Sequence, residues 1–192
     1  RTFWSFIREG GYENKQKSIG KPQFYRFSKP KDPSFPAMLE LFARTDVDLC
    51  DAESGLAPIH IDDEVSSLSA ILLDEEYYRL LIDNRTSADG IAILSVEGLI
   101  PFKAKAWLDL SARRADGQTV DEKSVRKHRN DICRLAVLLT GGERPAMSEA
   151  IRADMQRFIE AYESNQVDPK AFKISGVGAK QIVETLRSVY LQ

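Results

Sequence analysis

Hydrophobic and polar positions follow two patterns along the chain, with short apolar stretches in the first half and longer helical repeats after them. The stretch that ends at Gly10 and Gly11 has the spacing of the last turns of a helix. Residues 23–27 and 37–43 are short and rich in aromatic or aliphatic side chains, which favours strands. A proline-rich stretch separates them, so we predict that they pair antiparallel through a loop.

The pattern predicts four further segments before residue 96. Residues 12–21 are polar and are expected to form a loop, and residues 56–61 form a short candidate strand. Helical spacing runs through residues 66–82, and residues 90–95 are apolar enough for another strand. Ser95 then has the side chain of an N-cap for the helix that follows.

The last half of the chain is helical throughout. Residues 121–140, 147–163 and 178–191 each repeat apolar positions at helical spacing. This change of pattern predicts an α+β fold with a boundary between two parts. Residues 1–95 would hold a mixed sheet, and residues 96–192 would form a helical domain.

The segment LIPFKAKAWLDL, residues 99–110, places two lysines close together in an apolar helix. At ~100° per residue, Lys103 falls in the middle of the apolar side and Lys105 on the opposite side. We therefore expect Lys105 to be an ordinary solvated charge. An unpaired ammonium is costly to desolvate, so Lys103 needs a partner, a ligand or a route to water.

A second charged position faces inward on the helix predicted over residues 121–140. On the same helical wheel His128 and Asp131 fall on or beside the apolar face. One interpretation is a half-buried ion pair between Lys103 and Asp131 that locks two packed helices. The other is that the two side chains frame an anionic ligand such as a nucleotide phosphate.

Glu40 is a third candidate, because it lies between Met38 and Phe42 on one face of a predicted strand. Such a carboxylate serves either as an edge-strand charge that deters aggregation or as a metal ligand. A strand carboxylate together with an inward lysine and aspartate matches the groups that hold Mg²⁺ and neutralise phosphate in phosphoryl transfer.

Composition narrows the class of protein. The chain has 192 residues and a net charge of −2, so no global basicity points to nucleic acid. Cys50 and Cys133 are too few and too far apart for a zinc cluster. No apolar run reaches the ~18 residues of a membrane span and no signal peptide is recognisable, so we expect a cytoplasmic protein without a membrane partner. Because the chain begins at Arg1 in mid-helix, we expect it to be a fragment of a longer protein.

Two of these helices carry a resemblance to a known family. The segments VEGLIPFKAKAWL (96–108) and KHRNDICRLAVLL (127–139) resemble the C-terminal part of the abortive-infection nucleotidyltransferases, the AbiEii/AbiGii toxin family. Lys103 falls on the lysine of the family's first helix and Asp131 on the second aspartate of its later motif. Glu40, in the stretch MLELF, looks like the acidic residue of the third catalytic strand.

The resemblance implies a truncated nucleotidyltransferase-like sheet followed by a helical domain. It implies transfer of a nucleoside monophosphate from an NTP to an RNA or protein hydroxyl, with Mg²⁺ as cofactor. Glu40 would be a metal ligand or base, Lys103 would contact the triphosphate, and Asp131 would orient Lys103 or the acceptor. Lys127 is a further candidate for nucleotide binding. In a type IV toxin–antitoxin system, an antitoxin protein would be an additional partner.

The chain also departs from the family's pattern. Lys127 and His128 stand where the family's later motif has an Arg-Asp pair. The defining element, a Gly-Ser followed by Asp-x-Asp that binds the metals, is absent and would belong upstream of residue 1. We therefore expect residues 1–192 alone to be catalytically inactive.

Three further motifs suggest other chemistry. TDVDL (45–49) imitates Asp-x-Asp without the Gly-Ser, which favours a solvated loop over metal binding. His60 lies beside Asp62 and Asp63, where a surface loop is likewise favoured over a metal site. ISGVGAKQIVETL (174–186) resembles the turn of a helix-hairpin-helix, in which backbone amides grip a DNA phosphate. The segment before it is a poor helix, so DNA is not expected as a partner. A non-catalytic interaction or DNA-binding module is nevertheless the alternative function.

Overall fold

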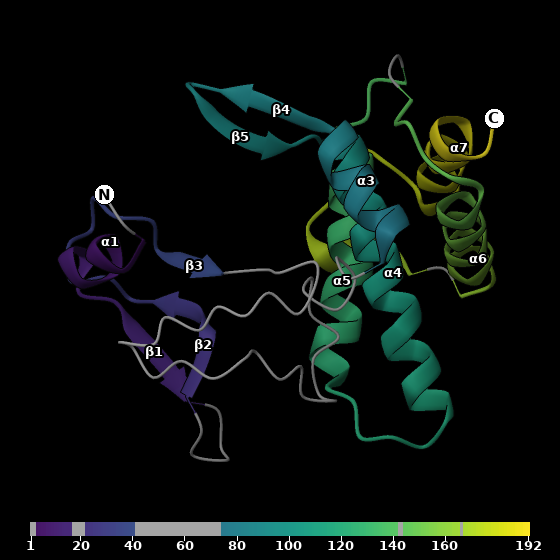
Figure 1. Ribbon diagram of the computed structural model, residues 1–192. Coiled ribbons are helices and arrows are strands. Elements are labelled where there is room, and N and C mark those ends of the chain that lie inside the picture. The colour runs from purple at the N-terminus through teal and green to yellow at the C-terminus, as the bar shows by residue number, and fades with distance from the viewer. Residues whose placement is uncertain (1–2, 17–21, 41–73, 142–143, 166) are drawn as a thin grey trace. The chain divides into compact units, whose positions relative to one another are not determined.

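The computed structural model describes residues 3–16, 22–40, 74–141, 144–165 and 167–192 (Figure 1). The chain divides into two compact units, residues 1–62 and 63–192, and each is described by itself. The described residues form a mixed α+β structure that is mostly helical, with two small antiparallel sheets. The predicted α+β class is therefore confirmed.

The N-terminal unit is a short helix followed by an antiparallel sheet. Its elements are α1 (Phe3–Gly10), β1 (Glu13–Gln16), β2 (Pro22–Ser28) and β3 (Met38–Glu40). The strand order is β1-β2-β3, and Phe27 pairs with Leu39. The predicted antiparallel pairing of β2 with β3 is confirmed. The prediction of a loop over residues 12–21 is wrong at β1, because that polar strand is defined by pairing with β2 rather than by any apolar alternation.

Aromatic rings form the small core of this unit. The ring centroids of Phe6 and Phe35 are 4.9 Å apart, and those of Phe3 and Phe27 are 5.6 Å apart. A Cβ atom at Gly10 would lie 2.6 Å from the Tyr12 ring and 2.7 Å from the Phe35 ring. The helix therefore ends at a glycine because the aromatic rings approach its backbone too closely for a side chain.

The C-terminal unit begins with a helix and a hairpin. Its first elements are α3 (Glu75–Asp83), β4 (Arg85–Ala88), β5 (Ile91–Leu94) and α4 (Val96–Ala115). Asp89 and Gly90 form the hairpin turn, and both have a positive φ, as a two-residue turn of this kind requires. The strand predicted over residues 90–95 is confirmed as β5, and Ser95 caps α4. Its partner β4 was not predicted.

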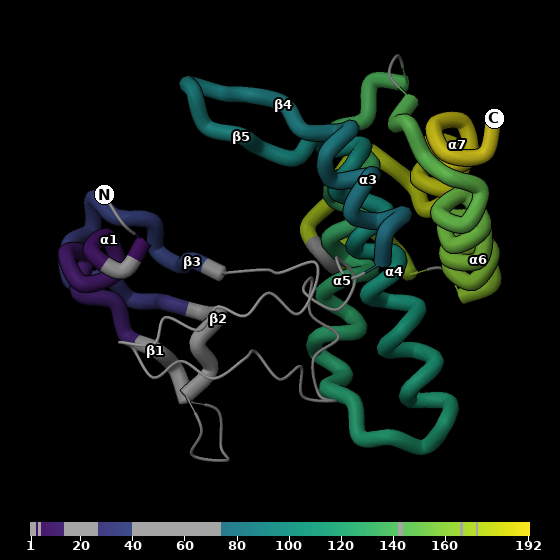
Figure 2. Tube along the Cα trace, in the orientation of Figure 1, coloured from purple at the N-terminus to yellow at the C-terminus, as the bar shows by residue number. Residues whose placement is uncertain are grey.

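Four helices complete this unit and pack around one apolar core. They are α5 (Glu122–Ala136), α6 (Glu149–Ser164), the short 3₁₀ helix η1 (Pro169–Phe172) and α7 (Ala179–Tyr190). Ile100, Ile132, Phe158 and Leu186 contribute fully buried side chains from α4, α5, α6 and α7. α4 and α5 run side by side in opposite directions, joined by the loop of residues 116–121 (Figure 2).

α4 contains a proline beyond its first turn. Pro101 has no N–H group, so the carbonyl of Glu97 loses its partner within the helix. The hydroxyl of Tyr190, at the end of α7, donates to this carbonyl at 2.9 Å. A tertiary contact therefore replaces the missing helical hydrogen bond.

The two-part division observed in the structure differs in position from the predicted one. α3 and the β4–β5 hairpin belong to the same compact unit as α4, whereas the predicted boundary at residue 95 separates them. Three predicted elements fall wholly or partly outside the described residues: the strand 56–61, residues 41–43 of the strand 37–43, and residues 66–73 of the helix 66–82. No helix in the described segments combines the length and the apolar character of a membrane span.

Candidate functional site

Lys103 and Asp131 face each other across the seam between α4 and α5. The Lys103 ammonium donates to the Asp131 carboxylate with 3.3 Å between Nζ and Oδ2. Their side chains are 24% and 22% exposed, so water or a ligand can still reach both. The structure therefore contains the ion pair that was one of the two interpretations of this spacing. The other carboxylate oxygen of Asp131 accepts from Arg134 at 3.2 Å.

His128 lies one helical turn from Asp131 and is half-buried. Burial is the main cause that lowers its pKa, and the charges of Lys103 and Lys127 lower it further, whereas Asp131 opposes them. The Nδ1 atom is buried and has no hydrogen-bond partner within the described part of the chain. A neutral imidazole therefore borders the ion pair. Lys127 itself is exposed on α5.

Glu40 is the last residue of β3, where it pairs with Arg26 of β2. Its side chain lies outside the part that the structure describes, and its strand belongs to the N-terminal unit. The structure thus brings Lys103 and Asp131 together. Glu40 belongs to the other unit, and its position relative to this pair is not defined.

The implied Mg²⁺ can be tested against the described side chains. They contain no group of three or more His, Cys, Asp or Glu residues that could hold a metal ion. Both oxygens of Asp131 are already engaged by cations. The described residues by themselves therefore do not fit a magnesium site.

The prediction that Lys105 is a solvated charge is wrong. Its side chain is 26% exposed, and its ammonium lies 3.5 Å from Asp109 on α4 and 3.6 Å from Asp154 on α6. The helical wheel placed Lys105 opposite the apolar face, but α4 packs against α5 on one side and against α3 and α6 on others. A central helix has no single solvent side.

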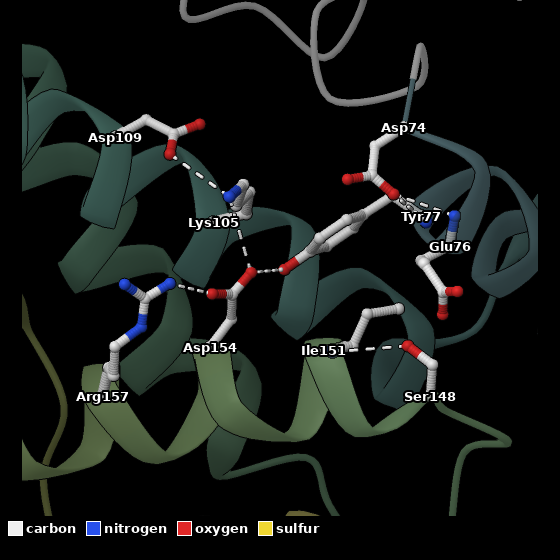
Figure 3. Close-up of polar contacts among 9 residues, drawn as sticks. All are labelled: Asp74, Glu76, Tyr77, Lys105, Asp109, Ser148, Ile151, Asp154 and Arg157. Carbon is white, nitrogen blue, oxygen red and sulfur yellow. Dashed lines mark hydrogen bonds and ion pairs between the residues drawn. The ribbon is translucent and has the colours of Figure 1, made fainter.

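Asp154 is the centre of the most buried polar cluster that the structure describes (Figure 3). Its side chain is 9% exposed, and it accepts a hydrogen bond from the Tyr77 hydroxyl at 2.9 Å. Lys105 contacts the same oxygen of Asp154 as Tyr77, and Arg157 contacts the other oxygen (Figure 3). Burial and the charge of Asp154 raise the pKa of Tyr77, so its hydroxyl stays protonated and donates.

The sequence contains a signal for this cluster that helical periodicity around Lys103 and Asp131 does not reveal. Asp154 lies three residues after Ile151 and four before Phe158, and both are fully buried on α6. A carboxylate on an apolar stripe at helical spacing calls for a cationic partner. With two cations and one hydroxyl around it, Asp154 fits a structural link among α3, α4 and α6.

The glycine-rich turn before α7 has part of the expected geometry. Gly176 has a φ of +81°, and Gly178 begins the helix without a side-chain cap. The preceding helical segment is only η1, which has four residues. Residues 45–49 and His60 lie outside the described residues.

Comparison with protein-family models, with curated proteins and with solved structures finds no match for this chain. The assignment of function therefore depends on the residues themselves.

Proposed function

We propose that this chain supplies nucleotide-contacting helices to a nucleotidyltransferase that moves a nucleoside monophosphate from an NTP to an RNA or protein hydroxyl. The observation that supports this proposal is the 3.3 Å contact between Lys103 and Asp131. These are the two helical positions that the AbiEii/AbiGii resemblance assigns to the active site. Nothing in their separate sequence segments requires them to meet.

In the proposed enzyme, Lys103 neutralises negative charge on the triphosphate, and Asp131 holds the ammonium in position until the nucleotide arrives. Arg134 shares Asp131, so the carboxylate keeps a cationic partner when Lys103 turns to a phosphate. His128, with its lowered pKa, adds no positive charge near neutral pH. Glu40 remains the proposed metal ligand or base, with Mg²⁺ as the proposed cofactor and an antitoxin protein as a proposed partner.

A purely structural ion pair is the competing explanation for Lys103, and lysine acylation separates the two. The 192-residue chain is treated with an amine-acylating reagent with and without each NTP and MgCl₂, and modified peptides are quantified by mass spectrometry. Lys105 is the matched control, because it lies on the same helix, is similarly exposed and is also paired with a carboxylate.

We expect an NTP to slow acylation of Lys103 at least several-fold and to leave Lys105 unchanged. Asp131→Asn should raise the basal acylation of Lys103 while circular dichroism shows an intact fold. Equal rates at Lys103 with and without every NTP would reject the proposal and leave the ion pair as a helix lock.

The second candidate is DNA binding through residues 174–186. The observation in its favour is that Gly176 turns the backbone into an uncapped start of α7, where free N–H groups can bind a phosphate. A fluorescent duplex would then bind the chain with an affinity that falls as salt rises. Gly178→Pro would abolish that affinity. Binding that is absent at low salt, or unchanged in this variant, would reject this candidate.

A further inference from the structure

The seam between α4 and α5 changes character along its length. On α4 the positions facing the seam repeat at alternating spacings of four and three residues: Ile100, Ala104, Trp107, Ser111 and Arg114. The first two are fully buried, but the last two carry polar side chains. The apolar character of the seam therefore ends near Trp107, although both helices continue.

α5 shows the same change on its own inward face. Ile132 and Cys133 are fully buried, and one turn earlier the corresponding position is Arg129, which is half-buried. Val125 is half-buried one turn before that, and Arg126 beside it is exposed. Arginine on the apolar stripe of a helix is unusual unless it has a partner. Where two helices both replace core residues by polar ones, the space between them suits a polar ligand.

The structure has a cavity of about 360 Å³ at this place. Trp107, Ser111 and Arg114 line it from α4, and Glu122, Val125, Arg126 and Arg129 line it from α5. We call it the Trp107 pocket. Its volume falls within the range of small-molecule sites. Lys103 and Asp131 are not among the lining residues, so the pocket is separate from the site described above.

The charges of the Trp107 pocket do not cancel. Arg114 pairs with Glu122 at 3.3 Å, and both side chains are largely exposed at the rim. Arg126 and Arg129 have no carboxylate within ion-pair distance among the described residues, and Arg129 donates to the Asn130 amide oxygen at 3.4 Å. Two guanidinium groups are thus left for an anion. Guanidinium groups bind phosphate oxygens in a paired geometry that lysine cannot reproduce.

Trp107 gives the pocket an aromatic wall. Its ring centroid lies 5.3 Å from that of Phe158, and the two rings are nearly perpendicular. Phe158 is fully buried, so it holds the indole from the core side while the indole lines the cavity. An indole of this kind can stack on a flat heteroaromatic ring.

We propose that the Trp107 pocket binds a nucleoside phosphate, with the base against Trp107 and the phosphate held by Arg126 and Arg129. The ligand is either a free nucleotide or the phosphorylated end of an RNA chain, since both present the same base and phosphate. A simple anion would leave the aromatic wall unused, and a neutral aromatic compound would leave two guanidinium groups unpaired. This site does not depend on the transferase activity proposed above.

Isothermal titration of the 192-residue chain tests this site with AMP, GMP, UMP, inorganic phosphate, adenosine and a short 5′-phosphorylated oligoribonucleotide. We expect the mononucleotides to bind and phosphate and adenosine each to bind at least about tenfold more weakly, because each offers only half of the contacts. Tighter binding of the oligonucleotide would identify the RNA end as the ligand, and equal binding would identify the free nucleotide.

The variants are chosen to preserve the fold. Arg126→Ala removes an exposed side chain from the pocket and should weaken nucleotide binding at least about tenfold. Arg113→Ala, on α4 outside the pocket, is the matched control and should leave binding unchanged. The proposal is overturned if no nucleotide binds at millimolar concentration, if phosphate alone binds equally well, or if both arginine variants behave alike.

Discussion

The hydroxyl of Tyr190, at the end of α7, donates to the backbone carbonyl of Glu97 in the first turn of α4, with 2.9 Å between the two oxygens. Pro101 leaves this carbonyl without a helical partner. Burial raises the pKa of Tyr190, so its hydroxyl keeps the hydrogen that it donates. The contact ties the C-terminal helix to the helix that carries Lys103.

Tyr190→Phe tests this tie. Removal of the hydroxyl leaves the Glu97 carbonyl unpaired beside a buried ring, so we expect the free energy of unfolding to fall by about 1–3 kcal/mol. Urea denaturation measures the loss. The companion variant is Pro101→Ala, which restores an N–H group that can bond Glu97 within the helix. In that background Tyr190→Phe should cost clearly less, and an equal cost in both backgrounds would contradict this account.

Asp154→Ala tests the buried cluster around α6. It leaves the Tyr77 hydroxyl without its acceptor and Lys105 without its more buried partner, so we expect a loss of about 1–3 kcal/mol in the free energy of unfolding. Asp109→Ala removes the more exposed partner of the same lysine and should cost less than about 1 kcal/mol. Chemical denaturation of both variants provides the measurement. Similar losses in free energy of unfolding for the two variants would show that the burial of Asp154 does not strengthen its contribution to stability.

The lowered pKa of His128 predicts how the free energy of unfolding depends on pH. Its pKa lies below the ordinary value of 6.5 in the folded chain, chiefly because of burial and then because of Lys103 and Lys127. The unfolded chain therefore binds this proton first as the pH falls. The stabilising contribution is fully present above pH 6.5 and is lost as the pH drops through the lower folded pKa. We expect this one group to add a slope of at most about 1.4 kcal/mol per pH unit.

The check is urea denaturation between about pH 7.5 and about pH 5. His128→Gln should flatten the pH dependence in this window, whereas His60→Gln, the substitution of the only other histidine, provides the comparison. A wild-type pH dependence that survives in His128→Gln would show that another group is responsible.

Local pattern predicted most of the helices and three of the five described strands, β2, β3 and β5. The caps at Ser95 and Gly10 were recognisable because each depends on a side chain, or its absence, at one position. β1 and β4 were missed, since both are short and polar and become strands only through pairing with β2 and β5. Pairing is a property of two segments, and neither segment shows it alone.

The candidate site was likewise predicted only in part from the sequence. Helical periodicity was enough to place Lys103 and Asp131 on inward faces, because that placement depends only on spacing within each helix. Which atoms would meet there was decided by the packing of α4 against α5, and the result is a 3.3 Å ion pair.

The sequence by itself determined where the helices run and which of their faces are apolar, because these follow from spacing along one segment. Only the tertiary structure decided that Lys105 would pair with Asp154 and that Tyr190 would donate to the carbonyl left free by Pro101. It also decided that the seam beyond Trp107 would form a cationic pocket. The physical reason is that α4 is surrounded by α3, α5 and α6. Burial and charge pairing on such a helix depend on neighbours far away in the chain.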